Sequence, residues 1–211
     1  MATESVHTVA EDLMKAAKME KCYENYILID VGANLTNKKY GRDLDSVVQR
    51  AKDSGVQKIM VTGTSVKASK EALRLTRIYP GTLYSTAAFT YKETISQYRS
   101  LAGIHPHDAK SYDEESWQEL CRIVQNTECV AVGECGLDYN RNFSNPEDQK
   151  AVFEKHIKLA IEHNKPLFVH ERDAFSDLSE ILDKYANKLP PVLVHCFTGS
   201  VENALAYLQK G

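Results

Sequence analysis

The chain has 211 residues, 43% of them hydrophobic and 26% charged, and its formal net charge is −3. This composition is typical of a globular protein with one domain, and it excludes collagen, a disordered tail protein, a disulfide-rich mini-protein and a globally basic nucleic-acid binder. No apolar run approaches the roughly eighteen residues of a membrane span, and the cysteines include no C-x-x-C pair, so we expect an intracellular protein of the nucleus or cytoplasm, with reduced thiols and no membrane partner.

Residues 1–21 are polar, and we expect them to form a flexible tail ahead of one domain over residues 22–211. Short apolar, β-branched runs follow, as in strands buried on both faces of a parallel sheet. These runs are 26–30, 58–62, 83–87, 129–133, 166–170 and 191–195. Between them, apolar residues recur at helical spacing over 43–54, 68–79, 115–125, a stretch opened by Pro146, 175–185 and 200–209.

Alternating strands and helices predict βαβ units around a parallel sheet. Two α/β architectures fit this alternation: an open doubly wound sheet and a (β/α)₈ barrel. The sequence contains neither a G-x-G-x-x-G nor a G-x-x-x-x-G-K-[ST] motif, which weakens the nucleotide-binding open sheet. We therefore predict an α/β fold of the TIM-like (β/α) barrel type. About six of its eight βα units would be present, because a whole barrel typically needs about 250 residues.

The apolar part of each of three predicted strands is followed immediately by a residue that can bind a metal. These residues are Glu134, His170 and His195. Successive members are about one βα unit apart, and the carboxyl ends of parallel strands line the active sites of α/β folds. A carboxylate with two imidazoles suits a divalent metal with open positions for water. Taken singly, each histidine could be structural and the glutamate could pair with the next helix, but three in register predict a metal site.

A further cluster contains His105 and His107 on either side of a proline. We expect His105 to contact substrate rather than metal, whereas His107 could equally be structural. Cys135 and Cys196 each follow a proposed ligand, and successive strand residues point to opposite faces. We therefore expect both thiols to point away from the metal. His156 falls on a helical pattern, and we expect it to have no role in the site.

Together these residues resemble the TatD family of metal-dependent deoxyribonucleases, which are TIM-barrel metal hydrolases. The motifs that carry the resemblance occur in the family's order, at 30–36, 103–108, 132–141, 169–173 and 194–199. The resemblance implies a divalent-metal site and hydrolysis of phosphodiester bonds in DNA. It implies that Glu134 is the catalytic residue and a metal ligand, and that His170 and His195 are the other ligands.

The sequence departs from the family's pattern in three places. Many relatives carry a His-x-His metal pair on the first strand, where this chain has Gly32 and Asn34. The family's Thr-Asp-Ala-Pro string on a late strand, which supplies the last metal ligand, does not occur. Residues 88–102 separate segments that are continuous in relatives. We therefore expect an insertion at 88–102, a barrel that is incomplete at its C-terminus, and weak or no activity for this polypeptide.

The expected reaction is attack on DNA by a water that one or two divalent cations activate, with Mg²⁺ or Mn²⁺ favoured and Zn²⁺ an alternative. Arg141 and Arg172 would bind phosphates, or else pair with acids such as Asp138 and Asp173. The alternatives are a metal-dependent deacylase or esterase with the same site, acting for example on aminoacyl-tRNA, and a non-catalytic truncated form. We expect a monomer; the native metal, exonuclease or endonuclease action, and preference for DNA or RNA stay open.

Overall fold

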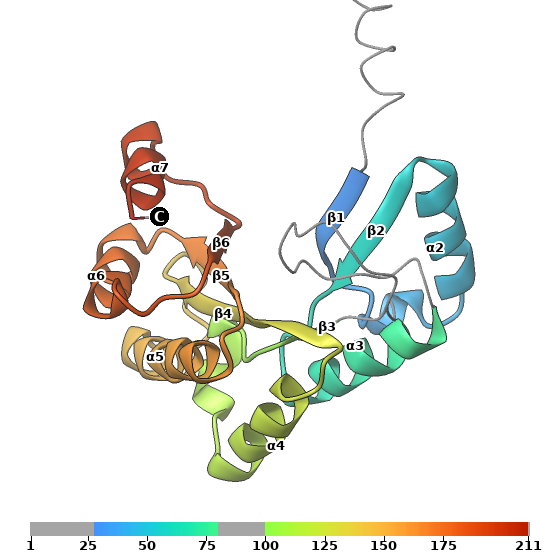
Figure 1. Ribbon diagram of the computed structural model, residues 1–211, viewed down its shortest axis with the longest axis horizontal. Helices are drawn as coiled ribbons and strands as arrows, with labels where there is room; N and C mark the ends of the chain where they lie inside the picture. The colour runs from blue at the N-terminus through green and yellow to red at the C-terminus, as the bar shows by residue number, and fades with distance from the viewer. Residues whose placement is uncertain (1–27, 80–99, 211) are drawn as a thin grey trace, which may run out of the picture.

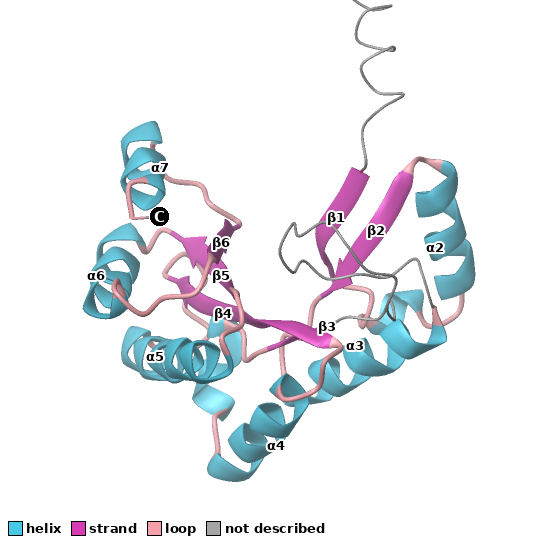
Figure 2. Ribbon diagram, viewed as in Figure 1, coloured by secondary structure: helices cyan, strands magenta, loops and turns pink. Residues whose placement is uncertain are grey.

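The structure is a computed structural model that describes residues 28–79 and 100–210. Six strands of this part form one sheet in which every neighbouring pair is parallel and the strands lie in sequence order (Figure 2). The strands are β1 (Leu28–Ala33), β2 (Val56–Val61), β3 (Ser100–Ala102), β4 (Cys129–Asp138), β5 (Leu167–Arg172) and β6 (Val192–His195). Sequential parallel order is the order of a (β/α) barrel.

Helices connect the strands and lie on the outside of the curled sheet (Figure 1). They are η1 (Lys38–Tyr40), α2 (Leu44–Asp53), α3 (Val66–Ile78), η2 (Pro106–Ser111), α4 (Glu114–Val124), α5 (Pro146–His163), α6 (Phe175–Tyr185) and α7 (Val201–Leu208). As expected, Pro146 opens α5, and the Asn145 side chain caps it by accepting from the Asp148 N–H. The described part is thus a curled, open sheet with helices on one side, which confirms the predicted TIM-like fold with about six βα units.

Parts of the predicted organisation lie outside the described residues: the tail at 1–21, the strand at 83–87 and residues 88–99 of the expected insertion. The last three residues of that expected insertion, Ser100–Ala102, are buried and form β3 between β2 and β4. Within the described ranges, no helix is both long and apolar enough to cross a membrane.

Strand β4 is longer than the sequence pattern predicts, because the pattern ends the strand at Gly133 whereas β4 continues to Asp138. Gly133 and Gly136 have φ values of +147° and +130°, which side chains disfavour. A Cβ on either residue would overlap a backbone oxygen of β5, that of Phe168 or His170. These glycines therefore bring β4 and β5 close together instead of ending the strand.

Apolar side chains pack on both faces of the sheet. The outer layer lies between the sheet and helices α4 to α6, and its fully buried members include Leu120, Phe153 and Leu178. The inner layer is formed by Met60, Leu101, Val130, Ala131 and Phe168. Phe168 precedes His170 by two residues, so the inner layer supports the strand end that carries the predicted metal ligands.

Candidate metal centre

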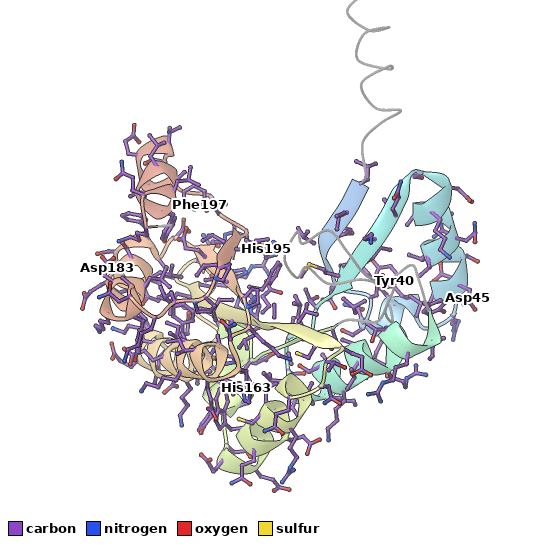
Figure 3. All side chains as sticks on the ribbon, in the orientation of Figure 1. Tyr40, Asp45, His163, Asp183, His195 and Phe197 are labelled. Carbon is purple, nitrogen blue, oxygen red and sulfur yellow. The ribbon has the colours of Figure 1, made fainter. Side chains whose placement is uncertain are left out.

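Three neighbouring strands bring Glu134, His170 and His195 together. Glu134 Oε1 lies 3.2 Å from His170 Nδ1 and 3.4 Å from His195 Nε2. Glu134 is in β4, His170 is in β5, and His195 is the last residue of β6, where Figure 3 labels it. Glu134 and His170 are buried, whereas the His195 side chain is 31% exposed.

The position of Glu134 depends on an irregularity in the sheet. The pairing of β4 with β5 shifts between Val132 and Cys135, and Glu134 lies inside this shift. Such bulges re-aim side chains and are frequent near active sites. Cys135 points into the outer apolar layer, as the alternation of strand residues predicts, while the Glu134 carboxylate faces the histidines.

The chemistry of these groups fits a divalent cation. Glu134 Oε1 lies within 3.4 Å of both His170 Nδ1 and His195 Nε2, so one cation could contact all three side chains. Burial opposes ionisation of Glu134, but the hydrogen bond with His170 and attraction to His105 and His195 lower its pKa. An anionic oxygen facing several imidazole nitrogens in a buried place is a set of groups able to hold a metal.

His105 also faces this centre. It precedes η2, and its Nδ1 accepts a hydrogen bond of 3.1 Å from the His107 N–H. Its Nε2 lies 3.6 Å from Glu134 Oε1 and 3.2 Å from His170 Nδ1. Burial lowers the pKa of His105 to about 4, against attraction from Glu134, so the ring is neutral at physiological pH. A neutral ring whose Nδ1 accepts must carry its proton on Nε2, which points into the centre.

Asp138, at the end of β4, is a site residue that the sequence reasoning named only as a possible partner for an arginine. Its Oδ2 lies 2.8 Å from His107 Nε2 and 3.0 Å from His170 Nε2. Burial opposes its ionisation, but hydrogen bonds from the Arg141 N–H, His107 and His170 lower its pKa to about 2. A signal was present in the sequence, since Asp138 lies four residues after Glu134 in the same motif, but the predicted strand stopped too early to include it.

Cys196 differs from expectation. Its Sγ lies 3.0 Å from His195 Nε2, and it belongs to the set with Glu134, His170 and His195 that could hold a metal. The expected alternation of faces fails because β6 ends at His195 and Cys196 has a φ of +56°. Burial, with repulsion from Glu134, raises the pKa of the Cys196 thiol, which keeps it protonated at neutral pH.

His156 behaves as a structural residue, as expected. It is fully buried in α5, its Nε2 accepts a hydrogen bond from the Ile104 N–H, and its Nδ1 lies 2.7 Å from the Val152 carbonyl oxygen. His156 therefore anchors the chain just before His105 and does not enter the centre itself.

The two arginines make no ion pair with an acidic residue in the described part of the chain. Asp138 Oδ1 accepts from the Arg141 backbone N–H at 3.0 Å, and the Asp173 carboxylate accepts from Asn140 instead. The Arg141 side chain is exposed. Arg172 is half-buried, and its Nε has no hydrogen-bond partner among the described residues. Neither guanidinium group is thus held by a carboxylate of the described residues.

Strand β1 also reaches the inner face, although it lacks the two histidines expected from relatives. A Cβ on Gly32 would lie 3.3 Å from the Phe168 ring and 3.5 Å from His195 Cε1. Gly32 therefore lies beside the His195 ring, where a larger side chain would press on it. The Asn34 side chain accepts a hydrogen bond from Thr36 on its own loop.

Comparisons with known proteins agree with this arrangement. A family model described as TatD related DNase matches residues 29–211. Curated relatives named 3′-5′ ssDNA/RNA exonuclease TatD are 38% identical in Shigella flexneri and 36% identical in Escherichia coli K12. Each match covers 184 residues, which are 87% of this chain and 65% of the relative. The chain thus spans 65% of the length of these relatives.

Solved structures show the same fold. YjjV, a TatD homologue from Escherichia coli K12, superposes with a TM-score of 0.74 at 26% identity, over 87% of this chain and 65% of that one. A TatD family hydrolase from Entamoeba histolytica gives a TM-score of 0.73 at 28% identity, over 88% of this chain and 63% of that one. The sequence match over nearly all the described residues and the shared barrel architecture lead to one conclusion: the chain belongs to the TatD-related DNase family.

Proposed function

We propose that the chain is a metal-dependent nuclease that hydrolyses phosphodiester bonds in DNA. The observation that carries the proposal is the buried Glu134 carboxylate, which the ring nitrogens of His105, His170 and His195 surround at 3.2 to 3.6 Å. Relatives whose printed names state exonuclease action on single-stranded DNA and RNA support the same substrate class.

In this proposal Glu134, His170 and His195 hold one or two divalent cations, with Mg²⁺ or Mn²⁺ favoured over Zn²⁺ because the substrate offers oxygen ligands. When bound, the cation would lower the pKa of a water and neutralise charge on phosphate oxygens. Glu134 contributes negative charge at the centre and is the catalytic residue.

The remaining side chains bind and orient the phosphate. His105 is neutral and directs its Nε2–H into the centre, so it can donate to a non-bridging phosphate oxygen. The half-buried Arg172 and the exposed Arg141 can each donate to a phosphate along the strand through their guanidinium groups. The two arginines would supply local positive charge for the phosphates, because the chain as a whole has a net charge of −3.

The test is cleavage of end-labelled single-stranded DNA, double-stranded DNA and single-stranded RNA by the purified chain. Each substrate is incubated with Mg²⁺, with Mn²⁺ or with EDTA, and an aminoacyl ester is assayed in parallel. Glu134→Gln keeps the shape but removes the charge. Glu128→Gln is the matched control, because Glu128 pairs with Arg77 on the surface, away from the centre.

We expect weak, metal-dependent cleavage of a nucleic acid, because the Thr-Asp-Ala-Pro ligand string is missing, and we expect it to be abolished in Glu134→Gln and retained in Glu128→Gln. Cleavage that survives in Glu134→Gln would contradict the assigned site. No cleavage of any nucleic acid by a folded sample would contradict nuclease function for this chain, and hydrolysis of the aminoacyl ester alone would replace it with deacylase function.

A further inference from the structure

The hydrogen bonds of Asp138 reveal a second layer behind the candidate ligands. Asp138 is 1% exposed. Its main chain is clamped by the buried Gln149, whose Oε1 accepts from the Asp138 N–H at 2.8 Å and whose Nε2 donates to the Asp138 carbonyl oxygen at 3.0 Å. The carboxylate of this residue is thus attached to a fixed piece of backbone.

The two carboxylate oxygens face different donors. Oδ1 accepts from the backbone N–H groups of Asn140 and Arg141, at 3.1 and 3.0 Å. Oδ2 faces Nε2 of both His107 and His170, at 2.8 and 3.0 Å. Backbone N–H groups can only donate, so Oδ1 must remain an acceptor. An ionised carboxylate is likewise only an acceptor, so His170 must donate its Nε2–H to Oδ2.

The other side of the His170 ring faces the candidate metal position. His170 Nδ1 lies 3.2 Å from Glu134 Oε1 and 3.2 Å from His105 Nε2. A neutral imidazole carries one proton, so donation of the Nε2–H to Asp138 leaves the lone pair on Nδ1, the nitrogen that faces Glu134.

We propose that Asp138 is a positioning residue that holds His170 in the tautomer with its proton on Nε2, so that Nδ1 is free to bind the metal. The inference rests on the metal site of the proposed function. Carboxylates that hold metal-binding histidines in this way orient the ring and raise its basicity, and their loss typically lowers metal affinity about 10- to 100-fold.

Asp138→Asn is the discriminating variant. The amide oxygen must remain on the side of the Asn140 and Arg141 N–H groups, so the new NH₂ group faces His170 Nε2. His170 Nε2 then has to accept, and its proton moves to Nδ1, where it blocks the metal position. Asp177→Asn is the matched control, because Asp177 accepts from Tyr139 and lies 3.4 Å from Lys150 without contacting the centre.

The tautomer is measured on the full chain, labelled with ¹⁵N-histidine and free of metal. Long-range ¹H–¹⁵N correlation at alkaline pH, where imidazoles are neutral, distinguishes the two tautomers, and His170→Gln assigns the signal. Metal affinity is measured separately by calorimetric titration with Mn²⁺. A purely structural role for Asp138 would change stability but would leave the tautomer of a folded variant unchanged.

We expect the Nε2–H tautomer in the unmodified chain and in Asp177→Asn, the Nδ1–H tautomer in Asp138→Asn, and Mn²⁺ affinity about 10- to 100-fold weaker in Asp138→Asn alone. The Nδ1–H tautomer in the unmodified chain would overturn the inference even if Asp138→Asn failed to fold. Unchanged Mn²⁺ affinity in a folded Asp138→Asn would also overturn it. Because the tautomer is read without substrate, an inactive chain with the expected tautomers would refute the nuclease proposal and leave this inference standing.

Discussion

The centre of the sheet and its β6 edge carry the same sequence feature, a histidine at the end of an apolar strand, in different surroundings. His170 in β5 is buried and hydrogen-bonded on both ring nitrogens, to Asp138 on one side and to His105 or Glu134 on the other. His195 in β6 is 31% exposed, and the 3.0 Å contact at its Nε2 is with the Cys196 thiol. Strand β5 pairs on both sides, whereas β6 pairs only with β5 in the described residues.

The difference shows that buried contacts hold the side chains on β4 and β5, whereas His195 on β6 has fewer of them. A groove of 710 Å³ runs along β6 between α6 and α7, with apolar walls that include Leu189, Leu193 and Phe197. Helix α7 has no buried residue. The β4–β5 side therefore holds its candidate ligands in buried surroundings, whereas His195 on the β6 side lies at a partly exposed edge.

The two histidines give the sharpest test of this comparison. His170→Ala removes a buried ring whose two nitrogens face the buried carboxylates of Glu134 and Asp138, and we expect unfolding free energy to fall by about 3–5 kcal/mol. His195→Ala removes an exposed partner and should cost less than about 1 kcal/mol. Urea unfolding of both variants without metal measures the difference. Equal losses would show that the two halves are equally well packed.

Core substitutions extend the comparison to the apolar layers. Phe153 is fully buried in the outer layer beneath α5, so Phe153→Ala should lower the unfolding free energy by about 3–5 kcal/mol. Leu208 on α7 is 76% exposed, so Leu208→Ala should change the unfolding free energy by no more than about 0.5 kcal/mol. A large loss in Leu208→Ala would indicate that something covers α7 in solution.

The pH dependence of stability tests the anchoring of the β4 side by His156. Burial lowers the pKa of His156 to about 4, so between about pH 6.5 and 4 the unfolded chain binds a proton that the folded chain does not. The contribution of His156 to the unfolding free energy is therefore fully present above about pH 6.5. It decreases as the pH falls, and about 3 kcal/mol is lost at pH 4. We expect His156→Gln to flatten this decrease in urea unfolding curves measured from pH 4 to 7, and His163→Gln on the same helix to leave it unchanged.

The smallest expected effect concerns the thiol at the β6 edge. Sulfur is a soft ligand that suits hard cations poorly, so Cys196→Ser should leave Mn²⁺ affinity unchanged. Zn²⁺ affinity should fall, since thiolates favour softer ions. Calorimetric titration with both metals checks this, and a loss of Mn²⁺ affinity in Cys196→Ser would make Cys196 a ligand for the favoured cation.

Periodicity determined much of the architecture. The apolar runs and helical stripes located five of the six described strands and the helices between them, because buried parallel strands and amphipathic helices each need a continuous apolar signal. The strand at Ser100–Ala102 was not predicted, because three residues are too few to show a period. The predicted strand ended too early at Gly133, because the glycine was interpreted as the end of the strand. In the structure β4 continues, and the glycine is required by the close approach of β5.

For the candidate centre, the sequence alone indicated that Glu134, His170 and His195 come after apolar runs of parallel strands and that these strands bring them together. This part was readable because strand order and chain direction place such residues at one edge of a sheet. Only the tertiary structure decided the roles of Asp138 and Cys196, and it did so through a bulge in β4 and a positive φ after β6. Hydrogen bonds between residues 31 to 65 positions apart join His105, His107, Asp138 and His170, and such partners depend on packing rather than on any local pattern.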